Sequence, residues 1–320
     1  MKSILQNKAY LYLTCLFLGI LTSFSLPPYN LVFLNFLSLP TLLYILINYT
    51  HKKIISFFVG WVFGFGYFIS NLYWITNSLT FDVNFKLIIP FALILIPLFL
   101  GIFYGLVTFL SSLFNLKNKL SSVLIFSIFF GGIEFLRSFI LGGFPWNLLV
   151  FSVSNNLPSL QILSYVGTYS LNLLSITIFL LPIIFFHKYK SSAAVIFFCF
   201  GLILVVINYS YGYFNIKNFE KKKYDKLDSV IRVVSPKVPI ERFLTNQSPE
   251  KNIDEMITLS DPNKSEKKIF IFPEGIITSI YFRDLKFFKN IFKKKFNANH
   301  KVILGINSIK ENKIYNSLVV

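Results

Sequence analysis

Seven apolar runs, each long enough to cross a lipid bilayer, dominate the first two thirds of the chain. They lie at residues 10–26, 31–49, 54–79, 87–114, 120–141, 160–186 and 193–213. A transmembrane helix needs about 20 predominantly apolar residues. The mean hydropathy of +0.63 and the 18% aromatic content are also too high for a soluble globular chain. The sequence therefore predicts a multi-span α-helical membrane domain with about seven transmembrane helices.

The charges divide the chain into two domains. Residues 1–216 contain ten Lys/Arg and two acids, whereas residues 217–320 contain twenty-one Lys/Arg and twelve acids. We expect a transmembrane helical domain at 1–216 and a water-soluble domain at 217–320. The lysines of the second part are interspersed with acids and form no basic helix with interleaved aromatics, so an anionic membrane surface is the expected partner rather than nucleic acid.

The connections between the runs predict the orientation in the membrane. Lys86 is the one basic residue on one side, and eight lie on the other: Lys2, Lys8, Lys52, Lys53, Lys117, Lys119, Lys188 and Lys190. Because cytoplasmic loops carry the excess of Lys and Arg, the N-terminus is predicted to be cytoplasmic. Seven crossings then place the soluble domain on the opposite side, which in a bacterial inner (cytoplasmic) membrane is the periplasm.

A few residues within the apolar runs are candidates for more than lipid contact. Glu134 and Arg137 are three residues apart on one helix face, and an unpaired charge at that depth is costly. We expect them to pair and hold the helix in the bundle, with contact to a substrate headgroup as the alternative. Trp146 lies in a Gly-Gly-Phe-Pro-Trp-Asn break that could carry substrate contacts. The glycine pairs at 60–64 and 101–105 predict close helix packing.

The two cysteines, Cys15 and Cys199, each lie inside an apolar run. Their positions provide neither the spacing of a metal site nor a disulfide framework. A thiol in hydrocarbon carries little thiolate, so both are interpreted as packing residues. We expect no metal and no cofactor.

The second domain alternates strands and helices. Strands are predicted at 229–235, 269–272, 302–307 and 314–320, and helices at about 249–259 and 280–296. Glu274 follows the second strand between Pro273 and Gly275, at a strand end where α/β folds place their chemistry. It is a candidate general base, with an ordinary loop acid as the alternative. About a hundred residues and four strands cannot cover both faces of a layered sheet, so the domain is expected to be partial.

Several stretches together resemble the apolipoprotein N-acyltransferase family. This family joins a multi-span membrane domain to a carbon–nitrogen hydrolase (nitrilase-like) domain, an αββα sandwich. The stretches are Leu-Tyr-Trp-Ile at 72–75, Glu-Phe-Leu-Arg at 134–137, Gly-Phe-Pro-Trp at 143–146, Ile-Arg-Val-Val-Ser-Pro-Lys-Val-Pro at 231–239, Phe-Pro-Glu at 272–274 and Tyr-Asn-Ser at 315–317. The resemblance implies transfer of an acyl chain from a phospholipid to the N-terminal diacylglyceryl-cysteine of a lipoprotein.

The resemblance also implies roles for particular residues. Glu274 matches the glutamate of a Glu-Lys-Cys triad and would be the base that activates the thiol. Trp146, Glu134 and Arg137 match elements expected to contact substrate. Phe243 is the aromatic residue nearest to the position where the family commonly has a tryptophan. The family's Lys, Cys and last span follow the Tyr-Asn-Ser element, so the chain is expected to be C-terminally truncated and inactive by itself.

Two other functions fit parts of the pattern. One is a non-catalytic membrane protein, in which the spans bind lipid and the second domain acts as a scaffold. The other is a transporter, but the sequence has no internal repeat, and Glu134 and Arg137 are the clear intramembrane charges.

Overall fold

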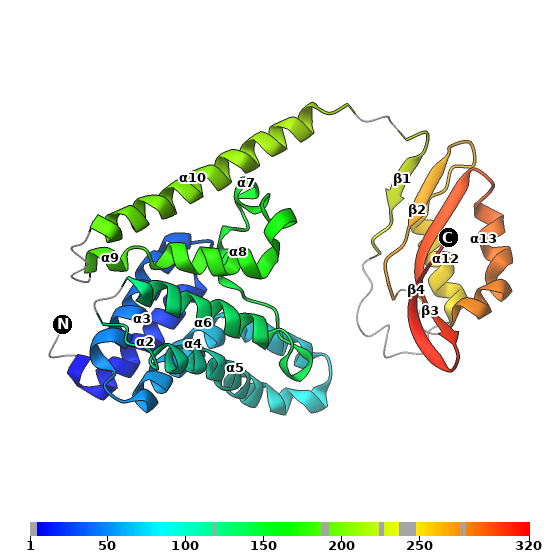
Figure 1. Ribbon diagram of the computed structural model, residues 1–320. Coiled ribbons are helices and arrows are strands. Elements are labelled where there is room, and N and C mark those ends of the chain that lie inside the picture. The colour runs from blue at the N-terminus through cyan, green and yellow to red at the C-terminus, as the bar shows by residue number, and fades with distance from the viewer. Residues whose placement is uncertain are drawn as a thin grey trace. The chain divides into compact units, whose positions relative to one another are not determined.

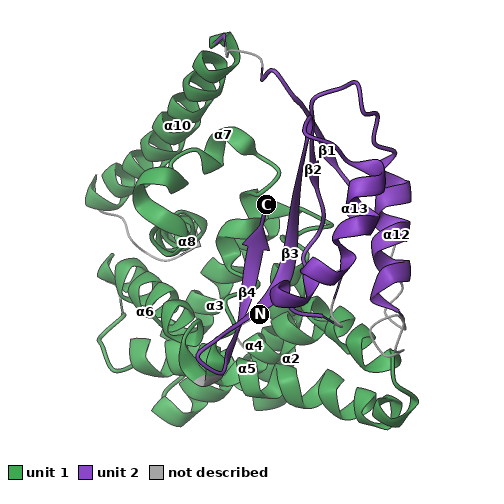
Figure 2. Ribbon diagram, turned by 90° about the vertical axis from the view of Figure 1, so that its right-hand side faces the viewer, with its two compact units in different colours: residues 1–222 green, residues 223–320 purple. Residues whose placement is uncertain are grey.

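The chain separates into two compact units, Met1–Lys222 (unit 1) and Lys223–Val320 (unit 2). The computed structural model describes residues 5–117, 120–186, 192–223, 227–236, 248–275, 277 and 280–320. Figure 1 shows the elements in chain order, and Figure 2 distinguishes the units by colour. The boundary predicted at residue 216 lies inside the last helix of unit 1.

The regular elements that the structure describes in unit 1 are all helices. Its α-helices are α2 (Lys8–Ser23), α3 (Asn35–Tyr49), α4 (Lys53–Asn71), α5 (Ile89–Ser111), α6 (Ser121–Arg137), α7 (Leu157–Leu160), α8 (Leu163–Leu180), α9 (Ile183–Phe186) and α10 (Ser192–Lys221). Short 3-10 helices lie between them: η1 (Val32–Leu34), η2 (Tyr73–Thr80), η3 (Val83–Ile88), η4 (Ile140–Gly142) and η5 (Leu149–Val153). Five helical segments of the described chain are long and apolar enough to span a bilayer. The protein is therefore membrane-embedded.

Several predicted runs are not single α-helices, and the runs 54–79 and 160–186 show the reason. In the run 54–79, α4 ends at Asn71 and η2 follows, where the hydroxyl groups of Thr76, Ser78 and Thr80 each donate to the carbonyl three residues earlier. Such local hydrogen bonds compete with the α-helix. The run 160–186 is divided among α7, α8 and α9, and Gly167 interrupts α8 with a φ of 73°.

Close glycine contacts join α4 to α5, as predicted. A Cβ placed on Gly64 would lie 2.9 Å from the Cα of Gly101, and a Cβ on Gly101 would lie 2.9 Å from the carbonyl oxygen of Trp61. The glycines therefore let the two backbones approach, which is the usual basis of helix association in membranes. In contrast, α10 is buried only at Ala194, Gly201 and Gly212 among its described residues, and it packs mainly along α7.

Unit 2 contains a four-stranded sheet in the order β1-β2-β3-β4 (Figure 1). Strands β1 (Val230–Val233), β2 (Lys268–Ile271) and β3 (His300–Lys310) are parallel, and β4 (Lys313–Val319) pairs antiparallel with β3. The β3–β4 turn consists of Glu311 and Asn312, both with positive φ, as tight hairpins require. The predicted order of strand, helix, strand, helix and hairpin is confirmed.

The helices of unit 2 cover one face of this sheet (Figure 2). Ile253 and Met256 of α12 (Pro249–Ser260) belong to the same buried cluster as Phe270 of β2 and Leu304 of β3. The single helix predicted at 280–296 is instead η6 (Phe282–Phe288) followed by α13 (Lys289–Lys295). On the opposite face, apolar side chains are exposed, including Val233 at 69% and Leu318 at 71%.

Candidate functional site

Glu274 lies just beyond the carboxyl end of β2, at the edge of the sheet where the parallel strands end. The strand pairing continues to Phe272, whose N–H donates to the Ile303 carbonyl at 2.9 Å. Pro273 has no N–H to extend the ladder, and Gly275 adopts a φ of 69°, which an L-residue rarely takes. The chain therefore turns away from the sheet and leaves Glu274 exposed.

Two neighbours shape the surroundings of Glu274. Asn316 of β4 donates a side-chain hydrogen bond to Glu274 Oε1. Gly305 of β3 leaves the space that Glu274 occupies, because a Cβ there would lie 3.0 Å from the Glu274 Cα. Glu274 and Asn316, together with Gly275 and Asn307, border a cavity of about 150 Å³. A carboxylate held on one side by an amide and open on the other can accept a proton from a nucleophile.

In unit 1, Glu134 and Arg137 form the predicted pair on α6. Arg137 Nη2 lies 3.8 Å from Glu134 Oε1, and both side chains are fully buried. The hydrogen bonds of the Glu134 carboxylate come from other helices: the Tyr104 hydroxyl of α5 donates at 2.9 Å, and the Asn172 amide of α8 donates to the second oxygen. Glu134 therefore connects α5, α6 and α8.

Arg137 holds the irregular segment that contains Trp146. Its guanidinium donates to the Phe144 carbonyl at 2.8 Å and to the Trp146 carbonyl at 3.1 Å. The Tyr67 hydroxyl of α4 donates to the Asn147 carbonyl at 2.7 Å. Non-helical backbone at membrane depth is tolerated where buried protein groups satisfy it. The Arg137 and Tyr67 side chains donate the hydrogen bonds that the carbonyls of residues 144, 146 and 147 need.

The Trp146 side chain is presented at the surface of unit 1. Its ring stacks on Trp74 of η2, with centroids 5.4 Å apart and an interplanar angle of 25°. Trp146 is 50% exposed and Trp74 is 41% exposed. The two rings form an exposed aromatic platform. Arg137 holds the Trp146 backbone in place, because its guanidinium donates to the Trp146 carbonyl.

The structure thus places the predicted residues in different settings. Glu134 and Arg137 are enclosed by protein groups, which favours their structural role over headgroup contact. Trp146 is accessible, as a substrate-contacting residue must be. Glu274 belongs to unit 2, and Phe243 lies outside the described residues.

The partners of these residues are not indicated by the local sequence pattern. Asn316, Tyr104 and Asn172 each contact a predicted residue from a distant element. The signal that could have identified Asn172 is a polar side chain within a span, which must find a partner. Across the residues that the structure describes, no group of three His, Cys, Asp or Glu side chains is positioned to hold a metal.

Comparison with known proteins identifies one family. The family described as apolipoprotein N-acyltransferase N-terminal domain matches residues 18–181, about half of the chain. Proteins named apolipoprotein N-acyltransferase from Agrobacterium fabrum and Brucella melitensis are 27% and 24% identical over 275 residues, covering 82% of this chain and 51% of each relative. One from Allorhizobium ampelinum is 33% identical over 128 residues, covering 40% of this chain and 24% of that relative.

This chain spans about half the length of the first two of these relatives. The family match lies within its membrane helices, and the alignments with the first two relatives extend over most of its residues. The chain therefore belongs to the apolipoprotein N-acyltransferase family.

Proposed function

We propose that this chain supplies the membrane domain and the base-bearing part of the second domain of a lipoprotein N-acyltransferase. The reaction would move an acyl chain from a phospholipid to the α-amino group of a lipoprotein's diacylglyceryl-cysteine. The observation that carries the proposal is Glu274, which follows a parallel strand directly, is held by Asn316 and opens onto a cavity. Family membership supplies the reaction class.

The chemistry assigned to Glu274 is proton transfer. Its carboxylate would take the proton of a cysteine thiol, and the thiolate would attack the phospholipid ester carbonyl to form a thioester and release a lysophospholipid. The lipoprotein amine would then attack the thioester, form the amide and regenerate the thiol. The cysteine, together with the lysine that would stabilise the oxyanion, is expected after residue 320, and no lysine of this chain is assigned its place.

The aromatic platform of Trp74 and Trp146 is proposed to contact the lipid substrates at the membrane surface, where Trp rings are favoured. Glu134 and Arg137 would act through it, because Arg137 binds the Trp146 backbone. Phe243 is retained as a proposed substrate contact on the sequence resemblance alone.

The finer architecture follows the same family resemblance. We propose seven spans in this chain, a cytoplasmic N-terminus and a periplasmic unit 2 in the bacterial inner membrane. The exposed apolar face of the sheet, with Val233 and Leu318, supports a nitrilase-like αββα sandwich in which a second sheet covers that face.

The test is an acyl-transfer assay in membranes, with a diacylated lipopeptide as acceptor and a mass gain of one acyl group as the readout. Three proteins are compared: this chain alone, the Agrobacterium fabrum relative, and a chimera in which this chain is followed by the part of that relative beyond the matched region. We expect transfer by the relative and the chimera and none by the chain alone.

Substitutions in the chimera test the base. Glu274→Gln removes the proton acceptor and should lower the rate by about 10²–10⁴-fold. Glu311→Gln, at an exposed acid in the β3–β4 turn, is the matched control and should leave the rate unchanged. Full activity of the Glu274→Gln chimera would refute the assignment. A folded but inactive chimera beside an active relative would favour the non-catalytic lipid-binding or scaffold alternative.

A further inference from the structure

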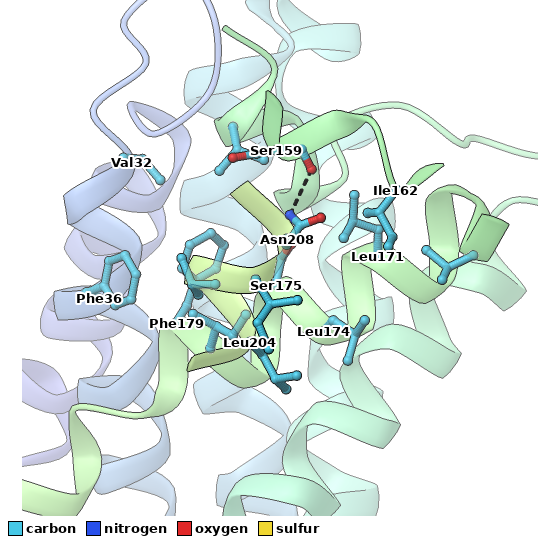
Figure 3. Close-up of a pocket in the computed structure, with 15 residues that line it drawn as sticks. Val32, Phe36, Ser159, Ile162, Leu171, Leu174, Ser175, Phe179, Leu204 and Asn208 are labelled. Atoms are coloured by element: carbon cyan, nitrogen blue, oxygen red, sulfur yellow. Dashed lines mark hydrogen bonds between the residues drawn. The ribbon is translucent and has the colours of Figure 1, made fainter. Parts of the chain in front are cut away.

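The cavity beside Glu274 differs in its lining from the larger cavity of unit 1. The larger cavity has a volume of about 460 Å³ and mainly apolar walls from α3, α8 and α10, and its amide residue Asn208 already donates to the Ser159 carbonyl at 3.0 Å (Figure 3). The cavity at Glu274 is bordered by a carboxylate residue and by two amide residues, Asn307 and Asn316. Of the two amides, Asn316 is the one bonded to the carboxylate.

The strand register places Asn316 on the sheet face that the helices of unit 2 leave open. Side chains along a strand alternate between the two faces. Val319 of β4 packs against the buried cluster on the helix-covered face, so Asn316, three residues earlier, lies on the opposite face beside its cross-strand partner Asn307. A slip of the hairpin by one residue would replace Asn316 with Tyr315 or Ser317. The pairing of β3 with β4 therefore selects the residue that meets Glu274.

Strand β3 fixes the main chain around Glu274 but not its carboxylate. Gly305 leaves space for the Glu274 Cα, and Asn307 pairs with Tyr281 in an isolated bridge beyond it. A glutamate side chain still has several rotatable bonds, and ordering it costs conformational entropy. Within the described part of the chain, Asn316 is the one side chain that bonds this carboxylate.

An amide is well suited to hold a base. Its N–H donates to one carboxylate oxygen, here Glu274 Oε1, and the amide itself neither takes up nor releases a proton near neutral pH. The second oxygen, Oε2, remains free to accept the proton of a nucleophile. A lysine in the same place would instead add a positive charge, which disfavours protonation of a carboxylate.

We infer that Asn316 is a positioning residue for acyl transfer: it holds Glu274 Oε1 so that Oε2 takes the thiol proton. The S–H bond breaks, the proton passes to Oε2 and a thiolate remains. The protonated carboxyl then gives that proton to the alkoxide of the departing lysophospholipid, which restores the carboxylate. This inference rests on the proposed function, because it requires Glu274 to be the base. Asn316 acts through Glu274 and is assigned no contact with substrate.

The test uses the chimera and measures formation of the acyl-enzyme from phosphatidylethanolamine in a single turnover, without lipopeptide acceptor. Asn316→Leu should lower the limiting rate about 10–100-fold, as misplacement of a catalytic group does. The phosphatidylethanolamine concentration at half-saturation should not change. Ser317→Ala is the matched control, because it removes the contact of Ser317 with the Ser308 hydroxyl on the other face of the same strand and should keep the rate.

Asn316→Asp separates positioning from folding. When both side chains at this position are ionised, they repel, whereas at lower pH the pair binds one proton and the aspartic acid O–H can donate to Glu274. The rate of this variant relative to the parent chimera should therefore rise as the pH falls, and the relative rate of Asn316→Leu should stay constant. A relative rate of Asn316→Asp that does not change with pH would overturn the inference.

A double variant tests whether Asn316 acts through Glu274. Asn316→Leu should cause no further loss in a chimera that already carries Glu274→Gln. Additive losses, or a full rate in Asn316→Leu beside an inactive Glu274→Gln chimera, would overturn the positioning role and leave the proposed base in place. Full activity of the Glu274→Gln chimera would instead overturn the proposed function.

Discussion

Arg137→Leu should destabilise unit 1 more than any other single change in its buried polar network. The substitution places an apolar side chain on α6 and removes the guanidinium hydrogen bonds to the Phe144 and Trp146 carbonyls, while the backbone bond from Phe144 N–H to the Arg137 carbonyl remains. It also leaves the buried Glu134 without its nearby positive charge.

The magnitude follows from the geometry. Removing one partner of a buried charged pair typically costs about 3–5 kcal/mol. Here the 3.8 Å separation between Arg137 and Glu134 is too long for a hydrogen bond, whereas the contacts to the Phe144 and Trp146 carbonyls are 2.8 and 3.1 Å. Most of the cost should therefore come from the unpaired carbonyls. Glu134→Gln, which keeps an acceptor for Tyr104, should cost only about 1 kcal/mol.

The assay is reversible unfolding of the purified chain in mixed micelles, with the two single variants and the double variant forming a thermodynamic cycle. Tryptophan fluorescence in a Trp61→Phe background reports on the stacked Trp74–Trp146 pair. We expect a coupling energy of about 1 kcal/mol between positions 134 and 137, well below the cost of Arg137→Leu. We also expect Arg137→Leu to change the accessibility of Trp146 to a quencher.

Two results would refute this reasoning. If Glu134→Gln rescued most of the stability lost in Arg137→Leu, the charge pair rather than the segment would account for the energy. If Arg137→Leu left the fluorescence of the aromatic platform unchanged, Arg137 would not position Trp146. Arg137→Lys provides a graded control, because a lysine keeps the charge but lacks the fork that reaches both carbonyls.

Three further changes test other parts of the structure. Gly64→Leu should cost at least about 1–3 kcal/mol by separating α4 from α5, while Gly132→Leu, with open space at its Cβ, should cost little in the same micelle unfolding assay. In the active chimera, Gly305→Ala should displace the proposed base and lower the transfer rate roughly tenfold to a hundredfold without unfolding the sheet, as checked by circular dichroism. The hydrogen bond and charge of Lys267 hold the pKa of Asp228 below its ordinary value. The ion pair therefore stabilises the fold slightly near neutral pH, and this stabilisation is lost as the pH falls through the lowered pKa. Amide exchange at β1 should accordingly become faster in acid, and Asp228→Asn should remove this pH dependence.

The sequence predicted the elements better than their ends. The apolar runs each contain a helix, but the run 54–79 continues into η2 and the run 160–186 is broken at Gly167. The length of an apolar run indicates how hydrophobic a segment is, but not whether its backbone forms one continuous helix. The breaks caused by the hydroxyl side chains of η2 and by the positive φ of Gly167 were therefore not predicted. The helix expected at 280–296 is divided between Phe288 and Lys289 into η6 and α13, and a capping box of Tyr281 and Asp284 marks its start.

What the sequence by itself determined is the class of protein: membrane helices from the length of the apolar runs, an alternating α/β unit from the change of periodicity, and Glu274 at a strand end from its flanking Pro and Gly. These are local properties of the chain. Only the tertiary structure decided which polar groups meet. Glu134 binds Tyr104 and Asn172, which are 30 and 38 residues away, and Glu274 binds Asn316, which is 42 residues away. Such pairs depend on how helices and strands pack, and no local pattern specifies them.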